Sequence, residues 1–202
     1  DRPRASSRRR FIVACIGDGR TSYSFDGGDY VNVYSAALAA ACSLGGFSGA
    51  NGTALVWGRI TSSPVWGAPT RVLLRIGASD SWVDIEKITD SLFLNYRASG
   101  TNKSVSDASL AGSTDWFLAC ITWNKSLDRV KVYLQGVQVG STQTGLGTWS
   151  GALDNTKCVL GAYTNTPTFG HSGLLAHAAV FANELTGVQV APDAQYAADV
   201  AQ

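Results

Sequence analysis

Residues 115–139 constrain the fold more strongly than any other part of the chain. Two long runs rich in apolar residues, 115–124 and 129–139, flank a polar turn at 125–128, and Gln135 and Gly136 mark a second tight turn. In the second run Val130, Val132 and Leu134 share one face, and Arg129, Lys131 and Tyr133 take the other. Because successive side chains of a strand point to opposite faces, this period of two predicts an antiparallel sheet with one face on a core.

The rest of the chain also alternates between short apolar runs and turn signals. We expect further strands at 11–16, 53–60, 71–76, 82–88, 91–96 and 157–160. Residues 61–70 and 140–156 have the composition of loops, and 98–114 form either a long loop or a weak edge strand. Helical turns are expected at 36–42, together with a terminal helix over 186–200 that breaks near Pro192. This pattern favours a β-sandwich over a parallel sheet.

Three stretches of the sequence resemble one known family. Residues 115–139 are similar to a central segment of the laminin-G-like family, which belongs to the concanavalin A-like jelly rolls. Residues 23–33 resemble its opening strand pair, and Leu160-Gly161 followed by 173–185 resembles its closing motif. The resemblance implies an all-β, two-sheet antiparallel jelly-roll sandwich. It also implies a protein that binds or scaffolds, with its sites in variable loops.

Charge is distributed unevenly and suggests two parts. Residues 1–10 carry five arginines and one aspartate, a net charge of +4, which leaves −3 for residues 11–202 because the whole chain has +1. We expect 1–10 to be a flexible basic arm and 11–202 to be a single jelly-roll domain. The chain has no run of 18 apolar residues, so we expect no membrane span.

The arm permits three interpretations. It is a solvated tail, an arm that docks on an acidic protein surface in an assembly, or a contact for nucleic-acid phosphates. The slightly acidic body shows no basic stripe, so we expect no specific nucleic-acid partner. In the assembly interpretation, other protein subunits, including copies of this chain, bind the arm through Arg2, Arg4, Arg8, Arg9 and Arg10.

Residues 82–86 resemble the Glu-x-Asp-x-Glu strand of some jelly-roll glucanases. Asp84 and Glu86 are expected to share a face of the strand, but Trp82 stands where the first glutamate would be needed. Retaining hydrolysis requires two carboxyl groups about 5–5.5 Å apart. We therefore predict no enzymatic activity and no catalytic residues, and interpret these side chains as a half-exposed polar strand face.

Metal and cofactor signals are weak. The best local source of calcium ligands is the pair Asp154 and Asn155, because calcium prefers several oxygen ligands. The closing motif has Ala176 and His177 where the resembled family usually has an acidic residue. We therefore expect neither a bound metal nor another cofactor.

The cysteines do not form a recognisable redox or metal motif. Cys15, Cys42, Cys120 and Cys158 are far apart in the sequence and include no CxxC pair. Disulfides remain an alternative, but we favour mostly free, buried thiols.

Aromatic residues in loops give the strongest binding signal. The candidates are Trp66, Trp149, Tyr163 and Phe169, all close to Pro or Gly. Aromatic rings on turns stack on sugar rings or anchor protein interfaces. The alternative is that these rings fill the ends of the sandwich.

Two functional hypotheses follow. The first is a non-enzymatic structural or decorating protein of an extracellular particle, such as a phage or virus virion, which is anchored by the arm and presents a surface for glycans. The resemblance allows this hypothesis, because laminin-G-like modules occur in virion surface proteins. The second is a secreted carbohydrate-binding module or lectin. Both place the protein outside the cell.

Overall fold

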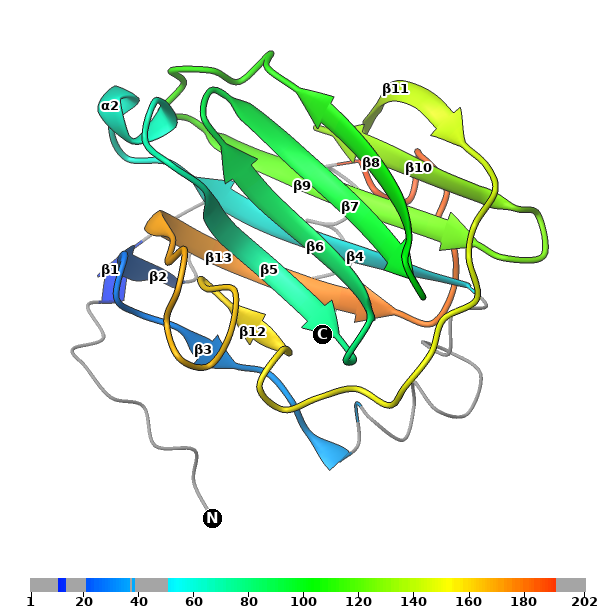
Figure 1. The fold of residues 1–202 in the computed structure, drawn as a ribbon. Coiled ribbons are helices and arrows are strands. Elements are labelled where there is room, and N and C mark those ends of the chain that lie inside the picture. Colours follow the sequence, from blue (N-terminus) through cyan, green and yellow to red (C-terminus); the bar gives the residue numbers. More distant parts are fainter. Residues whose placement is uncertain (1–10, 14–20, 37, 39–50, 192–202) are drawn as a thin grey trace.

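Two antiparallel sheets packed face to face form the molecule, as the computed structural model of residues 11–13, 21–36, 38 and 51–191 shows (Figure 1). The seven-stranded sheet has the order β1-β2-β13-β4-β9-β10-β11, and the six-stranded sheet has the order β3-β12-β5-β6-β7-β8. The predicted all-β, two-sheet sandwich is confirmed. No helix in these ranges is long and apolar enough to cross a membrane.

The strands of each sheet come from distant parts of the chain. The seven-stranded sheet contains β1 Phe11–Val13, β2 Thr21–Asp26, β4 Asn51–Arg59, β9 Trp116–Asn124, β10 Arg129–Leu134, β11 Val137–Gln143 and β13 Ser172–Phe181. The six-stranded sheet contains β3 Val31–Asn32, β5 Arg71–Gly77, β6 Ser81–Ile88, β7 Ser91–Ala98, β8 Thr101–Asp107 and β12 Val159–Leu160. In the seven-stranded sheet, β4 lies beside β9 and β2 lies beside β13, although these strands are far apart in the chain. Long connections rather than hairpins therefore join these neighbours.

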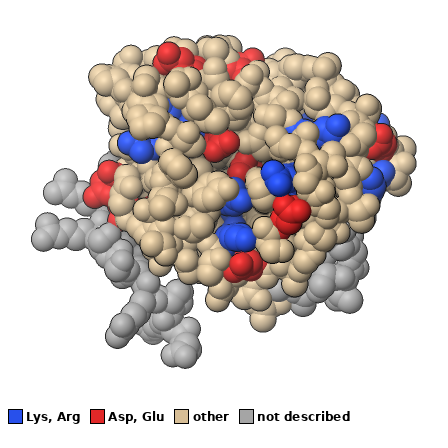
Figure 2. All heavy atoms as spheres, in the orientation of Figure 1, with Lys and Arg blue, Asp and Glu red and all other residues tan. Residues whose placement is uncertain are grey.

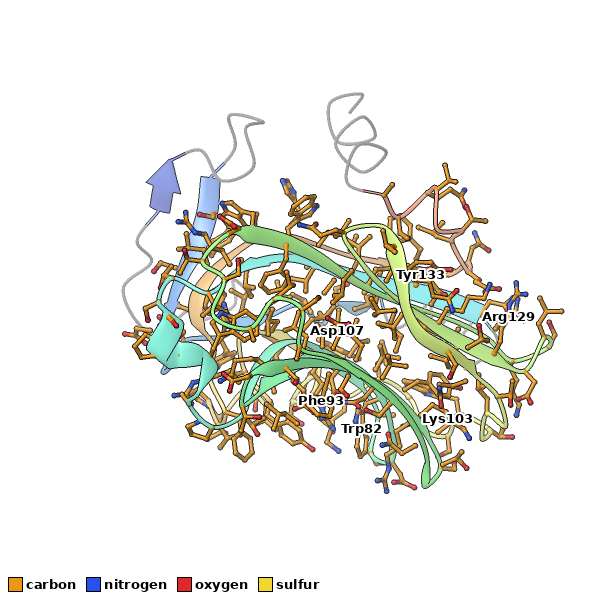
Figure 3. The ribbon with its side chains drawn as sticks, turned by 90° about the horizontal axis from the view of Figure 1, so that it is seen from above. Trp82, Phe93, Lys103, Asp107, Arg129 and Tyr133 are labelled. Atoms are coloured by element: carbon orange, nitrogen blue, oxygen red, sulfur yellow. The ribbon has the colours of Figure 1, made fainter. Side chains whose placement is uncertain are left out.

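The main core fills the layer between the sheets (Figure 3). Val130, Val132 and Leu134 are all buried in it, as their alternation predicts. Burial of such side chains contributes about 25 cal/mol for each Å² of apolar surface removed from water. The sandwich is therefore held chiefly by the alternation that the sequence displays.

A second apolar cluster lies on the outer face of the seven-stranded sheet. It contains Leu55, Trp57, Leu118, Cys120, Tyr133 and Val190. The segment after β13 contributes Leu185 and Val190, so this segment covers the outer face. Tyr133 is consequently buried, although its position opposite the core face suggests an exposed side chain. The sequence pattern predicted one buried face for this sheet, whereas the structure buries apolar side chains on both of its faces.

Several expected elements differ from the structure. Residues 23–33 contain two strands, but β2 and β3 belong to different sheets and do not pair. For 98–114 the sequence allowed a long loop or a weak edge strand, and the structure has β8 there, at the edge of the six-stranded sheet. The described residues of the expected terminal helix, 186–191, form turns, and 192–200 lie outside the described part, as do most residues of 36–42.

A short helix, α2 Ser63–Trp66, lies inside the expected loop at 61–70. The buried Lys87 explains it, because its ammonium donates hydrogen bonds to the carbonyls of Val65, Trp66 and Ala68 at 2.6, 2.8 and 2.7 Å. The last carbonyls of a helix have no partner within the helix, so a cation there stabilises the end. Lys87 thus fixes α2 over one end of the sandwich.

We predict that Gly52→Ala lowers the free energy of unfolding by about 1–3 kcal/mol, as overpacking of a core does. Gly52 pairs with Trp123 across β4 and β9, and a Cβ at Gly52 would lie 1.9 Å from Trp123 Cζ2. Trp123 is buried and has no room to move away. Urea denaturation measures the change.

The control is Gly67→Ala. A Cβ at Gly67 meets nothing closer than the Pro64 carbonyl oxygen at 4.0 Å. Its effect should stay within about 0.5 kcal/mol. Equal denaturation midpoints for the two variants would contradict the packing argument.

Candidate functional site

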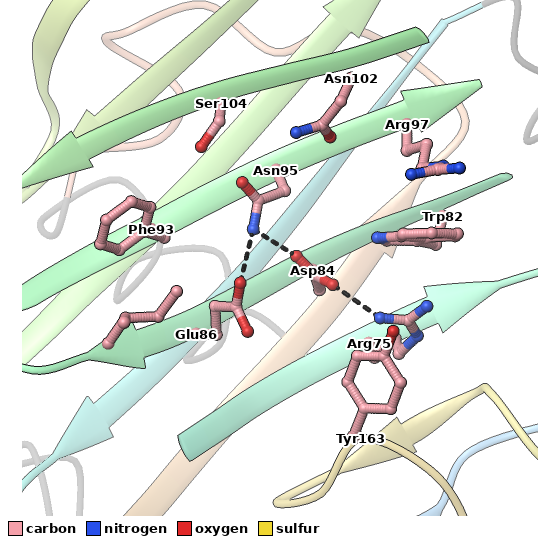
Figure 4. A pocket seen from close by; sticks show the side chains of 11 residues that line it. Arg75, Trp82, Asp84, Glu86, Phe93, Asn95, Arg97, Asn102, Ser104 and Tyr163 are labelled. Carbon is pink, nitrogen blue, oxygen red and sulfur yellow. Dashed lines mark hydrogen bonds and ion pairs between the residues drawn. The ribbon is translucent and has the colours of Figure 1, made fainter. Parts of the chain in front are cut away.

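A pocket with a volume of about 310 Å³ opens on the outer face of the six-stranded sheet (Figure 4). Val83 and Ile85 of β6 point into the core, so the alternation directs Trp82, Asp84 and Glu86 outward. Strands β5, β6, β7 and β8 and the loop after β12 supply the lining, which consists of Arg75, Trp82, Asp84, Glu86, Ile88, Phe93, Asn95, Arg97, Asn102, Ser104 and Tyr163. On this face basic and acidic side chains lie next to one another, as Figure 2 shows.

The floor of the pocket is a chain of polar contacts around Asp84. Arg75 Nη1 donates to Asp84 Oδ2 at 2.8 Å, and both side chains are buried. Asn95 Nδ2 donates to Asp84 Oδ1 at 2.8 Å and to Glu86 Oε1 at 2.9 Å. Asp84 and Glu86 share a face as predicted. The interpretation as a half-exposed strand face is wrong for Asp84, because the ion pair allows this carboxylate to be buried.

Four side chains stack in a column along one wall. The Arg75 guanidinium lies 3.8 Å from the ring centre of Tyr163 and 4.3 Å from that of Trp82, and the Arg97 guanidinium lies 4.6 Å from that of Trp82. Figure 4 shows Trp82 between the two guanidinium groups. Such contacts are attractive because the ring faces are negative. Both faces of Trp82 are thus occupied, and only the edge of its ring faces the pocket.

Burial changes the acidity of the two carboxyl groups. Burial, followed by repulsion from Asp84, raises the pKa of Glu86 to about 7, while the Asn95 hydrogen bond and Arg75 oppose this change. Burial also raises the pKa of Asp84, against the opposing effects of Arg75 and Asn95. Glu86 therefore gains or loses its charge close to neutral pH.

The predicted aromatic residues separate into two groups. Trp66 and Trp149 have exposed fractions of only 1% and 8%, so neither ring is available as a stacking surface, which corrects that prediction. Trp66 donates to the Ser113 carbonyl at 2.7 Å beneath α2, and Trp149 packs beside Tyr96. These two rings fill the ends of the sandwich because the space between the sheets is otherwise open there.

Tyr163 and Phe169 do lie together. Their ring centres are 5.8 Å apart with an edge-to-face arrangement, and Tyr163 lines the pocket. Phe169 is 51% exposed. The structure thus brings two of the four predicted aromatic residues together, and one of them, Tyr163, lines the pocket.

The candidate metal ligands are engaged in local structure. Asp154 Oδ1 accepts hydrogen bonds from the Thr156 amide and hydroxyl, both at 2.8 Å, and the Asn155 carbonyl accepts one from Asn32 Nδ2, also at 2.8 Å. Within the described ranges, no three His, Cys, Asp or Glu residues gather as a metal site. This loop arrangement is a turn that stabilises itself.

The thiol prediction is confirmed for two of the four cysteines. Cys120 and Cys158 are free and buried. Cys15, Cys42 and the arm arginines Arg2, Arg4, Arg8, Arg9 and Arg10 lie outside the described residues.

Sequence reasoning missed most of the pocket. Arg75, Asn95 and Arg97 are polar positions within otherwise apolar strands, and Asn102 and Ser104 lie on the edge strand β8. The signal available in the sequence was this interruption of apolar runs at alternate positions. It indicates a polar outer face, but it does not show which strands are neighbours.

Comparison with known proteins gives similarity of structure alone. Neither a protein-family model nor a curated protein sequence matches the chain. The carbohydrate-binding module CBM40 of the Ruminococcus gnavus IT-sialidase, bound to α2,3-sialyllactose, superposes with a TM-score of 0.64 at 12% identity, over 84% of this chain and 94% of the module.

Two further matches are parts of botulinum neurotoxins. The serotype D binding domain matches with a TM-score of 0.66 at 15% identity, over 98% of this chain and 46% of the domain. A type C toxin structure, described as depending on two ganglioside molecules for cell entry, matches with a TM-score of 0.63 at 14% identity, over 94% of this chain and 44% of its own. The chain spans less than half the length of these toxin domains. The likeness shows a shared jelly-roll sandwich.

We predict that the free energy of unfolding falls between about pH 5 and about pH 8 more steeply in the native protein than in Glu86→Gln. The folded-state pKa of Glu86, about 7, exceeds its usual value of 4.5, so the folded protein keeps a proton that the unfolded chain has lost. The resulting stabilisation is complete below the unfolded pKa and is lost as pH rises through the folded pKa. Urea midpoints across this range measure it, and parallel pH profiles for the two proteins would contradict it.

Proposed function

We propose that the protein binds carbohydrate through the pocket on the outer face of the six-stranded sheet. The observation that carries this proposal is the convergence of neutral and charged hydrogen-bonding groups on one concave surface, with Phe93 and Ile88 beside them. Sugar recognition requires donors and acceptors that match hydroxyl groups, and an apolar surface that matches C–H groups. A pocket with a few fixed polar groups meets that need.

The structural neighbours support the same class of function. One of them is bound to a sialylated trisaccharide, and another is described as entering cells through gangliosides. Their identity to this chain is only 12% and 14%, so the fold likeness supports a glycan ligand without naming the sugar. A laminin-G-like relationship remains part of the proposal.

We propose binding without hydrolysis. Retaining hydrolysis uses two carboxyl groups that both reach the scissile bond. Here both oxygens of Asp84 already accept hydrogen bonds, from Arg75 and Asn95, and Trp82 occupies the position of the first glutamate in the strand motif. Of the two carboxylates in the pocket, only Glu86 has an oxygen without a hydrogen-bond partner among the described residues.

A location on an extracellular particle, such as a virion, is also proposed. It rests on the basic arm, which carries +4 against −3 for the rest of the chain. A second copy of the chain, or a similarly acidic subunit, offers the carboxylates that arginine binds in pairs. The alternative is a secreted lectin whose arm has no partner.

We predict that Ser104→Trp weakens glycan binding at least about tenfold, a loss of about 1.4 kcal/mol. Ser104 is exposed on edge strand β8 and lines the pocket, so an indole there fills the cavity without disturbing the core. A glycan array identifies the ligand, and calorimetry compares the variants.

Ser141→Trp is the matched control. Ser141 is exposed on β11 of the other sheet and does not line the pocket. The glycan affinity of the Ser141→Trp variant should equal that of the native protein. If both indole variants bind equally well, the glycan site lies elsewhere, and if an array with neutral and acidic glycans gives no signal, the proposed function is wrong.

We predict that deleting residues 1–10 leaves the thermal midpoint almost unchanged but weakens self-association. The segment is too polar and charged to bury apolar surface in its own domain. Sedimentation velocity of the full and shortened chains at about 50 and about 500 mM salt tests this, because salt screens exposed charge pairs. The assembly hypothesis would be wrong if the deletion lowered the thermal midpoint strongly, or if neither the deletion nor the added salt changed self-association.

A further inference from the structure

We propose that this pocket selects an uncharged, hydroxyl-rich sugar unit over a carboxylate-bearing one, and that the ionised Glu86 side chain causes the selection. This inference rests on the proposed glycan-binding function and names its ligand class. It differs from what the ligand of the sialyllactose-bound neighbour would suggest.

The floor of the pocket offers acceptors rather than donors. Asn95 uses its amide nitrogen to donate to both Asp84 and Glu86, so the group that it leaves for a ligand is its carbonyl oxygen. The second oxygen of Glu86 has no hydrogen-bond partner in the described part of the chain. Sugar hydroxyls donate to such oxygens, whereas a glycan carboxylate has no proton to give.

The charges around the pocket leave Glu86 unmatched. From β5, Arg75 is paired with Asp84 of β6 at 2.8 Å. From β7, Arg97 is paired with Asp80 at 3.2 Å. Glu86 forms no ion pair within 4 Å among the described residues, and its other polar neighbours in the pocket are neutral.

Those neutral neighbours are Asn95 on β7, Asn102 and Ser104 on β8, and Tyr163 in the loop after β12. An acidic sugar unit in this pocket therefore meets an unpaired carboxylate at its floor. Like charges at close range in a partly buried site repel more strongly than in water, because the surroundings screen them less.

Protonation of Glu86 weakens the preference. A protonated carboxyl donates one hydrogen bond, so it becomes a partner for a ligand carboxylate and stops repelling it. The burial that raises the pKa of Glu86 to about 7 places this change within an accessible range. By linkage, an acidic ligand then binds with uptake of a proton, and a neutral ligand that donates to the ionised group binds with release of one. The two ligand classes must show opposite dependence on pH.

The test uses matched pairs of sugars that differ by an acidic group. Methyl glucoside and methyl glucuronide, methyl galactoside and methyl galacturonide, and lactose and 3′-sialyllactose are titrated into the full chain at about pH 5.5 and about pH 8. We expect the neutral member of the best-binding pair to bind at least about tenfold tighter at the higher pH. We expect that ratio to fall at least about fivefold at the lower pH.

Two variants separate charge from shape. Glu86→Gln keeps the size of the side chain and should remove the pH dependence of the ratio. Asp115→Asn removes an exposed carboxylate outside the pocket and should leave the ratio unchanged. Thermal midpoints confirm folding, and if Glu86→Gln does not fold, the opposite pH slopes of the two ligand classes in the native protein decide the question.

The outcomes distinguish the two proposals. If none of the sugars binds at either pH, the selection is wrong, and if the glycan array also gives no signal, the proposed function is wrong as well. If sugars bind but the acidic member is preferred at about pH 8, or both classes have pH slopes of the same sign, the selection alone is wrong.

Discussion

The buried ion pair between Arg75 and Asp84 is the interaction on which the site depends. The two residues are register partners on β5 and β6, and both are shielded from water although they lie on the face away from the main core. Removal of one member of such a pair leaves an uncompensated charge and typically costs roughly 3–5 kcal/mol. Trp82 and Tyr163 stack on the Arg75 guanidinium and cover the pair.

The outer faces of the two sheets differ in polarity and in how they are covered, and the pocket lies on the more polar of the two. On the seven-stranded sheet the outer face is apolar, and the segment with Leu185 and Val190 covers it. On the six-stranded sheet most outer positions around the pocket are polar, and the pocket between them is open to solvent. Successive side chains of β6 point to opposite faces, so Val83 and Ile85 point into the core while Asp84 and Glu86 point into the pocket.

The sequence predicted what depends on local periodicity. Strand β10 was predictable because its residues alternate between apolar and polar, and β9 because it is a long, nearly continuous apolar run between polar residues. Helix α2 was not, because it depends on Lys87, about twenty residues away in the chain. Likewise, Trp66 and Trp149 look like surface residues among prolines and glycines, yet the open ends of the sandwich bury them.

The pocket could be predicted only in part for the same reason. The sequence shows that Asp84 and Glu86 share a face, since both lie on β6. It does not show that Asn95 of β7 joins them or that Arg75 of β5 neutralises one of them, because both facts depend on the order of the strands. The raised pKa of Glu86 follows from these contacts and from burial, not from its sequence context.

The proposed glycan recognition in this pocket relies on hydrogen bonds and charge more than on aromatic stacking. Many sugar sites place a ring face against the sugar, but both faces of Trp82 are taken by guanidinium groups. The groups that remain are the oxygens of Glu86 and Asn95, the side chains on β8, and the apolar side chains of Ile88 and Phe93. A jelly roll holds such residues on its outer face without constraint from the core, so domains that share this fold can accept ligands that differ in charge. In the proposed function, the charge state of one side chain on that face, rather than the shared fold, determines which glycan is bound.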